Sequence, residues 1–210
     1  LLNFFFTEDD LDFIEKIDED RFTREDVAAL IGPKADAFLA SAYRRGILNL
    51  VDEAAGLYQL GSFYGMLDVF SISETEKYRS LPRDTRAQLD AWYFDEYYNS
   101  LEPEPSVRPT KDEILLLEDV LKFIDAQDRP VYLNYCDCRS LNGDCGLPTR
   151  TCITYKNGPN TFAHRGHSLP IDKEKAKEVV RQADRAGLMH TVNPNGICSC
   201  CGDCCYLFRS

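Results

Sequence analysis

Nine cysteines constrain this chain more than any other feature, because all of them lie after residue 135. They follow the pattern C-x-C-x6-C-x6-C, then 45 other residues, then C-x-C-C-x2-C-C. A chain of 210 residues that is 44% hydrophobic can bury a core without cross-links, so the thiols indicate a chemical role. The candidate metal ligands are Cys136, Cys138, Cys145, Cys152, Cys198, Cys200, Cys201, Cys204 and Cys205.

Three kinds of cysteine site compete for this pattern. A disulfide framework is disfavoured because nine is an odd number, adjacent cysteines pair poorly, and the acidic opening LLNFFFTEDD lacks the features of a signal peptide. Structural zinc usually takes four ligands from two separated knuckles, and the repeated C-x-C differs from that arrangement. Iron-sulfur clusters are therefore the favoured cofactor, with zinc as the alternative.

One triplet carries the positive case for a cluster. Cys198, Cys201 and Cys204 have the C-x2-C-x2-C spacing that supplies three corners of a 4Fe-4S cube. Adjacent cysteines do not easily reach the same metal, so we expect Cys200 and Cys205 to face a second cluster. Two cubes need about eight thiolates, which leaves one cysteine spare; a single cluster with several free thiols stays open.

Charge and cysteines divide the chain into two unlike parts. Residues 1–110 carry 22 Asp and Glu against 11 Lys and Arg, whereas residues 111–210 carry 13 of each. Thr7 and Thr23 are helix caps, a third helix follows from about Ala35 to Arg45, and ILNLV and GLYQL predict a hairpin. Three short helices and a hairpin predict a winged-helix-like domain over residues 1–80. DNA binding is disfavoured because a basic face is missing, so we expect this domain to dock a protein.

The remaining segments predict a helical connector and an α/β domain. Residues 81–109 hold an aromatic helix, TRAQLDAWYFDEYY, followed by a proline-rich stretch, and we expect its rings to form core or a seam between domains. In residues 110–210, Thr110 and Glu113 predict a capping box for a helix that leads to strand VYLNY and C-x-C. A helix from about Asp172 to Ala186 leads through LMHTV to the second C-x-C. The fold class is therefore α+β, with a pseudo-duplicated helix, strand and C-x-C unit that brings two cysteine-rich loops together.

The cysteine segments resemble a known family. The series CDCR, Cys145, Cys152, HRGHSLPIDKEKAKEVVRQADRAGLMH and ICSCCGDCC is similar to the C-terminal part of 4Fe-4S binding proteins found mainly in anaerobic bacteria and archaea. The motifs are specific from about Tyr135 to Tyr206, and SFYGMLDVF and YFDEYY resemble segments of the N-terminal part of that family. This resemblance implies cluster binding and electron transfer, and it implies no substrate.

Three functions follow for testing. The favoured one is a cytoplasmic electron carrier or redox subunit whose acidic domain docks a redox partner with a basic surface. The second is an iron-sulfur regulator that binds DNA, and the third is a zinc-stabilised interaction module. No run of about 18 apolar residues predicts a membrane span. Whether residues precede Leu1, and the oligomeric state, stay open.

Two kinds of polar residue are weaker candidates. Arg139 directly follows Cys138, so it is a candidate for tuning a cluster from outside its ligands, with an exposed arginine as the alternative. His164, His167 and His190 are expected to be structural or solvated, the first two in a flexible loop. No catalytic residues are predicted.

Overall fold

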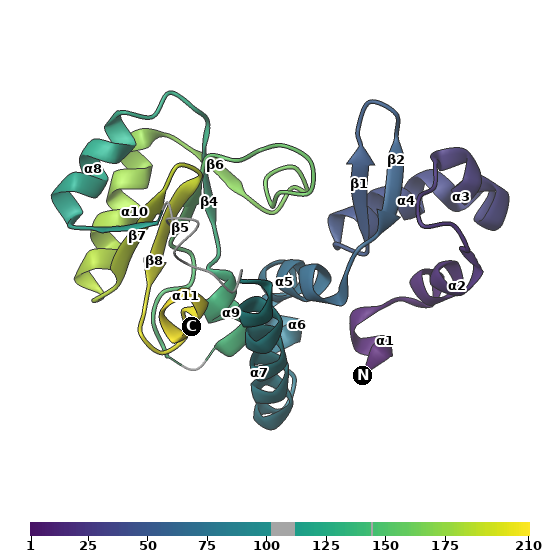
Figure 1. Ribbon diagram of the computed structural model, residues 1–210, viewed down its shortest axis with the longest axis horizontal. Helices are drawn as coiled ribbons and strands as arrows, with labels where there is room; N and C mark the ends of the chain where they lie inside the picture. The colour runs from purple at the N-terminus through teal and green to yellow at the C-terminus, as the bar shows by residue number, and fades with distance from the viewer. Residues whose placement is uncertain (102–111, 144) are drawn as a thin grey trace.

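The computed structural model describes residues 1–101, 112–143 and 145–210 and has a mixed α+β fold in two lobes (Figure 1). The N-terminal lobe contains α1 (Leu2–Phe5), α2 (Glu8–Lys16), α3 (Arg24–Ile31), the 3-10 turn η1 (Gly32–Lys34), α4 (Ala35–Arg44), and the hairpin of β1 (Leu48–Asp52) and β2 (Leu57–Leu60). Three further helices run between the lobes: α5 (Phe63–Ser73), α6 (Thr75–Arg79) and α7 (Arg83–Ser100).

The C-terminal lobe is a six-stranded sheet with two long helices. Its elements are β3 (Glu113–Leu115), α8 (Leu117–Asp125), β4 (Val131–Asn134), α9 (Asp137–Asn142), β5 (Cys152–Thr154), β6 (Leu169–Ile171), α10 (Lys173–Arg185), β7 (Met189–Asn193), β8 (Gly196–Cys200) and α11 (Tyr206–Arg209). The strand order is β3-β7-β8-β5-β4-β6, and every neighbouring pair is antiparallel. Figure 1 shows α8 and α10 lying side by side on one face of this sheet.

Local capping explains the helices that the sequence predicts correctly. Thr7 and Thr23 each accept a hydrogen bond from the backbone of an aspartate three residues later, whose side chain bonds back to the threonine. These reciprocal bonds satisfy amide groups that a helix start leaves unpaired. The predicted third helix and hairpin are confirmed as α4 and as the β1-β2 pair.

One predicted helix start is wrong. Glu113 does not begin a helix, because residues Glu113–Leu115 form the edge strand β3 and pair with β7. The helix starts at Leu117, and Ile114, which lies in the edge strand, is 64% exposed. The other half of the expected capping box, Thr110, lies outside the described residues. Pairing with a strand about 75 residues away overrides the local signal, which is common for strands.

The expected repeat is present only in part. Each C-x-C pair follows a helix and a strand, as predicted. The first pair lies where β4 leads into α9, but Cys198 and Cys200 lie inside strand β8, one hairpin beyond β7, and not in a loop. A strand alternates its side chains between two faces. In β8 this alternation turns Cys198 and Cys200 to the same face, where the candidate metal centre lies.

The loop at residues 156–168, here called the docking loop, joins the two lobes. Arg165 donates to the carbonyl oxygen of Leu48 at 3.0 Å and also to the Tyr43 carbonyl and the Asn49 side chain. The carboxamide of Asn160 bonds to both backbone groups of Leu50 at 2.8 Å. The loop is therefore held against the N-terminal lobe by specific contacts.

The histidines of the docking loop take part in these contacts. His164 lies 2.6 Å from the Tyr43 hydroxyl through Nδ1 and 2.8 Å from Glu53 through Nε2. His167 Nε2 lies 2.6 Å from the Arg44 carbonyl oxygen. Both histidines have the structural role that the sequence favours.

Candidate metal centre

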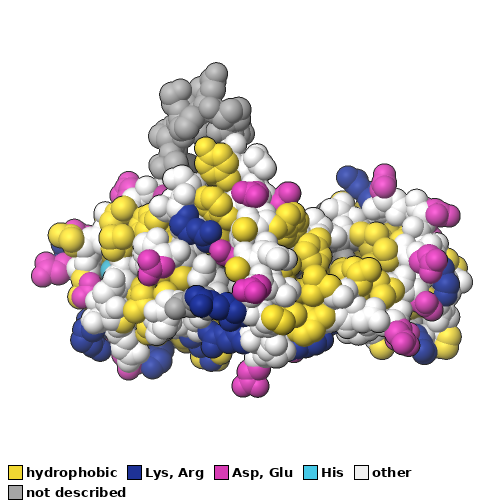
Figure 2. Space-filling model, turned by 90° about the horizontal axis from the view of Figure 1, so that it is seen from below, with side chains coloured by type: hydrophobic (Ala, Val, Ile, Leu, Met, Phe, Trp, Pro, Cys, Tyr) yellow, Lys and Arg dark blue, Asp and Glu magenta, His cyan; other side chains and the backbone are white. Residues whose placement is uncertain are grey.

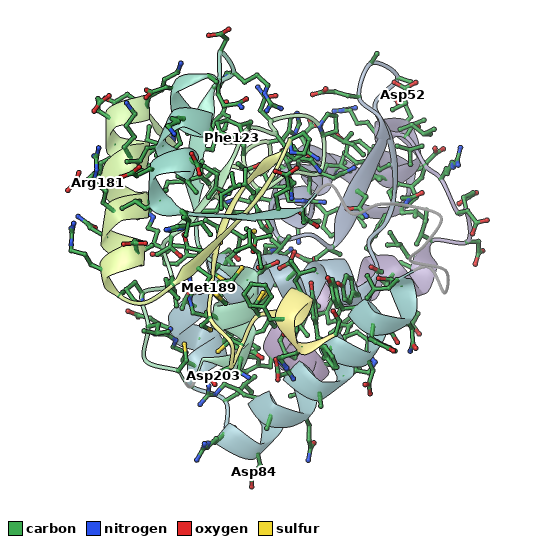
Figure 3. The ribbon with its side chains drawn as sticks, turned by 60° about the vertical axis from the view of Figure 1, so that its left-hand side comes forward. Asp52, Asp84, Phe123, Arg181, Met189 and Asp203 are labelled. Atoms are coloured by element: carbon green, nitrogen blue, oxygen red, sulfur yellow. The ribbon has the colours of Figure 1, made fainter. Side chains whose placement is uncertain are left out.

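Strand alternation turns three cysteines toward the same side of the sheet. Ile153 of β5 and Ile197 of β8 are paired and packed in the core beneath α8 and α10. Their neighbours Cys152 and Cys198 therefore point to the opposite face, and Cys200 joins them two residues along β8. Figure 3 shows sulfur atoms gathered at this end of the sheet, between the labelled Met189 and Asp203.

Six thiols meet on that face and form the feature we call the cysteine ring. Each lies beside two others, in the closed order Cys136, Cys138, Cys205, Cys200, Cys198, Cys152. Thr191 also donates to the Cys200 sulfur at 3.6 Å. A cavity of about 250 Å³ lies between the ring and four tyrosines, Tyr64, Tyr93, Tyr97 and Tyr206. The ring is thus made by strands β5 and β8 and by the first residues of α9 and α11.

The direction of the pKa shift alternates around the cysteine ring. Hydrogen bonds from neighbouring thiols lower the pKa of Cys136, Cys198 and Cys205, that of Cys205 to about 3. The same bonds raise the pKa of the three cysteines between them, Cys138, Cys152 and Cys200. Metal ligation requires thiolates, and alternate positions of the ring already favour that form.

The remaining three cysteines form a separate group, the cysteine triad. The sulfur atoms of Cys145, Cys201 and Cys204 all lie within 4.8 Å of one another. Cys201 and Cys204 pack with Ala183 and Leu188. The triplet that the sequence assigned to one cube is therefore divided, because β8 sends Cys198 to the ring and the next turn carries the other two away. Cys200 and Cys205 lie apart from Cys201 and Cys204, but they share the ring with Cys198, which the sequence had placed with the other group.

Arg139 lies between the ring and the triad and is 1% exposed, which excludes the exposed alternative. It donates to the carbonyl oxygens of Ser199 at 2.6 Å and Pro148 at 2.9 Å, and to the Thr151 hydroxyl. Burial lowers the pKa of Arg139, but electrostatic attraction to neighbouring cysteines, Cys136 first among them, outweighs burial and raises that pKa. The positive charge of the buried Arg139 guanidinium is thus balanced by cysteine sulfurs of the ring on one side and of the triad on the other.

Two carboxyl groups that sequence reasoning missed stand beside the ring. Burial, and after it the negative charge of Cys136, raises the pKa of Asp137 to about 7. Burial likewise raises the pKa of Asp68 well above its ordinary value, and one oxygen of its carboxyl group has no hydrogen-bond partner among the described residues. Asp68 is the one charged residue in helix α5, FYGMLDVFSIS, and that isolation was the available signal.

Aromatic residues close the ring from the side of the N-terminal lobe. Tyr93 of α7 stacks on Tyr64 of α5 at 4.1 Å and on Tyr206 of α11 at 5.1 Å between ring centroids. The aromatic helix is thus a seam between the two lobes, as the sequence favoured.

By contrast, Cys198 is exposed, and beside it opens a second cavity of about 410 Å³ lined by Asn134, Asn160 and Lys156. Solvent therefore reaches the ring at its Cys198 corner.

His190, the third histidine, lies apart from both cysteine groups. It is 2% exposed, lies 3.4 Å from the Ser199 hydroxyl through Nδ1, and lies 3.7 Å from Asp184 through Nε2. Burial lowers its pKa. It acts as a core histidine.

The six thiols of the ring surround a cavity with a buried cation nearby, an arrangement that suits a metal cofactor held by cysteine sulfur. All nine cysteines are free, which excludes the disulfide framework in this structure.

Among the described residues, no helix has the length and apolar character needed to cross a membrane. Comparisons with protein families, curated proteins and solved structures found no match to this chain.

Proposed function

We propose that the cysteine ring binds an iron-sulfur cluster and that the protein passes single electrons to a partner protein. The observation that carries this proposal is the convergence of six cysteines from four separate elements around one cavity. Nothing in the fold requires these thiols to meet, so their convergence supports a shared ligand. Their number exceeds the four thiolates of a 4Fe-4S cube, so four would ligate and two would lie against the cluster.

The division of the cysteines bears on the number of clusters. Two cubes would take about four thiolates each, but the structure groups the nine cysteines as a ring of six and a triad of three. This division favours a single cube in the ring over two cubes. Zinc remains the alternative ligand of the ring.

The surroundings of the ring suit one-electron chemistry. An iron-sulfur cluster, when bound, accepts and releases one electron at a time. The positive charge of Arg139 would favour the reduced state, since that state carries one more negative charge. The stacked Tyr64, Tyr93 and Tyr206 form an apolar wall on the side of the cavity that faces the N-terminal lobe. The exposed corner at Cys198 is where we place electron exchange with the partner.

The N-terminal lobe is proposed to dock that partner. Its helices and hairpin have the order of a winged helix, and we assign residues 1–80 to it, 81–109 to the connector and 110–210 to the cluster domain. Figure 2 shows Asp and Glu side chains spread over this lobe, at the right of the view. This charge would attract a basic partner surface.

DNA binding by the same lobe has less support. Lys34 lies 3.9 Å from Asp9, and Arg45 is bound by the buried carboxylate of Asp10 at 2.5 Å. The end of α4 and strand β1 are also occupied by the docking loop. These cations are therefore engaged by acidic side chains and are poorly placed to neutralise phosphates.

The test is metal and sulfide analysis of anaerobically purified protein, with visible spectra before and after dithionite. We expect iron and acid-labile sulfide in about equal amounts, about four of each, and absorption that bleaches on reduction. Cys152→Ser, in the ring, should lower iron and sulfide together. Zinc without iron or sulfide would refute the redox proposal and leave a structural module.

A further inference from the structure

The cysteine triad is a second donor group that the proposed function does not use. Cys201 and Cys204 come from the turn after β8, and Cys145 comes from the loop after α9. None of the three belongs to the cysteine ring. The triad thus brings two distant segments together at a place separate from the proposed cluster.

The spacing of the triad sulfurs matches one ion. Sulfurs that surround a single tetrahedral ion at about 2.3 Å lie about 3.8 Å apart. Thiolates on the corners of a 4Fe-4S cube lie further apart, at about 6 Å, because sulfide separates the irons. All three triad sulfurs lie within 4.8 Å of one another, which is too close for three corners of a cube.

The ring differs from the triad in the space that it encloses. Neighbouring sulfurs are also close in the ring, where Cys136 and Cys138 lie within 4.8 Å of each other, so spacing alone does not separate the two groups. The six ring sulfurs together, however, line a cavity of about 250 Å³. Cys201 and Cys204 instead pack directly on Ala183 and Leu188. The contrast in packing therefore favours different occupants for the two groups.

Asn142 supplies a second observation at the triad. Its amide nitrogen donates to Asp90 at 3.2 Å, which fixes the orientation of the carboxamide. Its oxygen then lies 3.3 Å from the Cys204 sulfur. A fixed carbonyl oxygen beside the Cys204 sulfur can add a fourth donor to the three sulfurs around one ion. The buried guanidinium of Arg139 next to Cys201 offsets the negative charge of the thiolates.

We propose that Cys145, Cys201 and Cys204 bind a single soft divalent ion, zinc or ferrous iron, with the Asn142 oxygen at the fourth position. Thiolate ligands select such ions over magnesium or calcium. Cys145 is only half-buried, so the ion can reach the triad from solvent. This site does not depend on the ring, and it would hold its ion even if the ring held no cluster.

The experiment compares two matched cysteine variants of the full chain, purified anaerobically. Iron, zinc and acid-labile sulfide are measured per chain, together with the visible spectrum. Cys204→Ser should lose about one zinc or iron per chain with sulfide and visible absorption unchanged. Cys152→Ser is the control in the ring, and its effect on iron and sulfide tests the cluster separately.

A second triad variant guards against misfolding. Cys145→Ser changes a half-buried residue, so it should preserve the fold and lose the same single ion. The inference is overturned if both triad variants lose sulfide along with iron, because the triad would then ligate a cluster. It is also overturned if both keep the full metal content.

Discussion

Asp90 is the residue whose replacement should most clearly uncouple the C-terminal helix α11 from α7. It is 6% exposed and accepts hydrogen bonds from Tyr206 at 2.8 Å and from Arg209 at 3.0 and 3.1 Å. Asn142 donates to it as well, at 3.2 Å. Cys205 directly precedes α11. The Asp90→Ala change should therefore loosen Cys205, one of the six thiols of the ring.

The expected loss in the free energy of unfolding follows from the hydrogen-bonding groups that Asp90→Ala leaves without their partner. Breaking a buried ion pair by removing one member costs about 3–5 kcal/mol. Arg209 keeps 24% of its side chain exposed, so water can replace part of its lost interaction. We therefore expect about 3 kcal/mol for Asp90→Ala, at the lower end of that range. Tyr206→Phe removes a single hydrogen bond and should cost about 1.5 kcal/mol.

Chemical denaturation of both variants, followed by far-ultraviolet circular dichroism, measures the difference in the free energy of unfolding. The rate at which a chelator removes iron from the folded protein gives an independent reading of the Cys205 loop. Iron should leave Asp90→Ala faster than it leaves Tyr206→Phe. If the two variants agree within about 0.5 kcal/mol and release iron equally fast, the carboxylate does not anchor α11.

Three further perturbations test other parts of the structure. Burial opposes ionisation of Asp10, but hydrogen bonds from Arg45 and Thr7 outweigh it and lower its pKa. The stabilisation that ionised Asp10 gives to the folded state is therefore present above the unfolded pKa of about 3.9 and lost as pH falls through the lower folded pKa. The free energy of unfolding, measured as a function of pH, should fall less on acidification for Asp10→Asn than for the unchanged protein. Arg165→Lys can satisfy only part of three acceptors in the N-terminal lobe, so denaturation should show a loss of about 3 kcal/mol; an unchanged midpoint would contradict the docking role. Arg139→Met should make the reduction potential more negative, by about 60 mV for each 1.4 kcal/mol of lost attraction; voltammetry showing a rise would contradict the assigned role of its charge.

The features that the sequence predicts well are those that local chemistry decides. Thr7 and Thr23 begin their helices because the partner of each cap is three residues away. Asp172 caps α10 in the same way, and α10 ends just before Gly187, whose φ of 83° suits glycine. Such signals need no knowledge of the rest of the chain. The mixed α+β class follows from them and is confirmed.

The features that the sequence misses depend on pairing across the chain. Glu113 looks like part of a helix cap, yet β7 recruits it into a strand. The C-x2-C-x2-C spacing suggests one cube, but it holds only if Cys198 and Cys201 lie on one continuous loop. Because Cys198 lies inside β8, strand geometry separates them. The place of Asp68 beside the ring likewise requires α5 to pack on α9.

The register of β8 decides which cysteines face the ring and which do not. Cys198 and Cys200 face the ring, whereas a shift of one residue would present Ser199 and Cys201 in their place. Gly196 opposes such a shift, because a Cβ there would lie 2.4 Å from the Ile153 carbonyl oxygen. Ile197, fully buried in the core, fixes the neighbouring position. A single residue inserted between Ile197 and Cys198 would thus keep every cysteine in the chain yet turn Cys198 and Cys200 away from the cysteine ring.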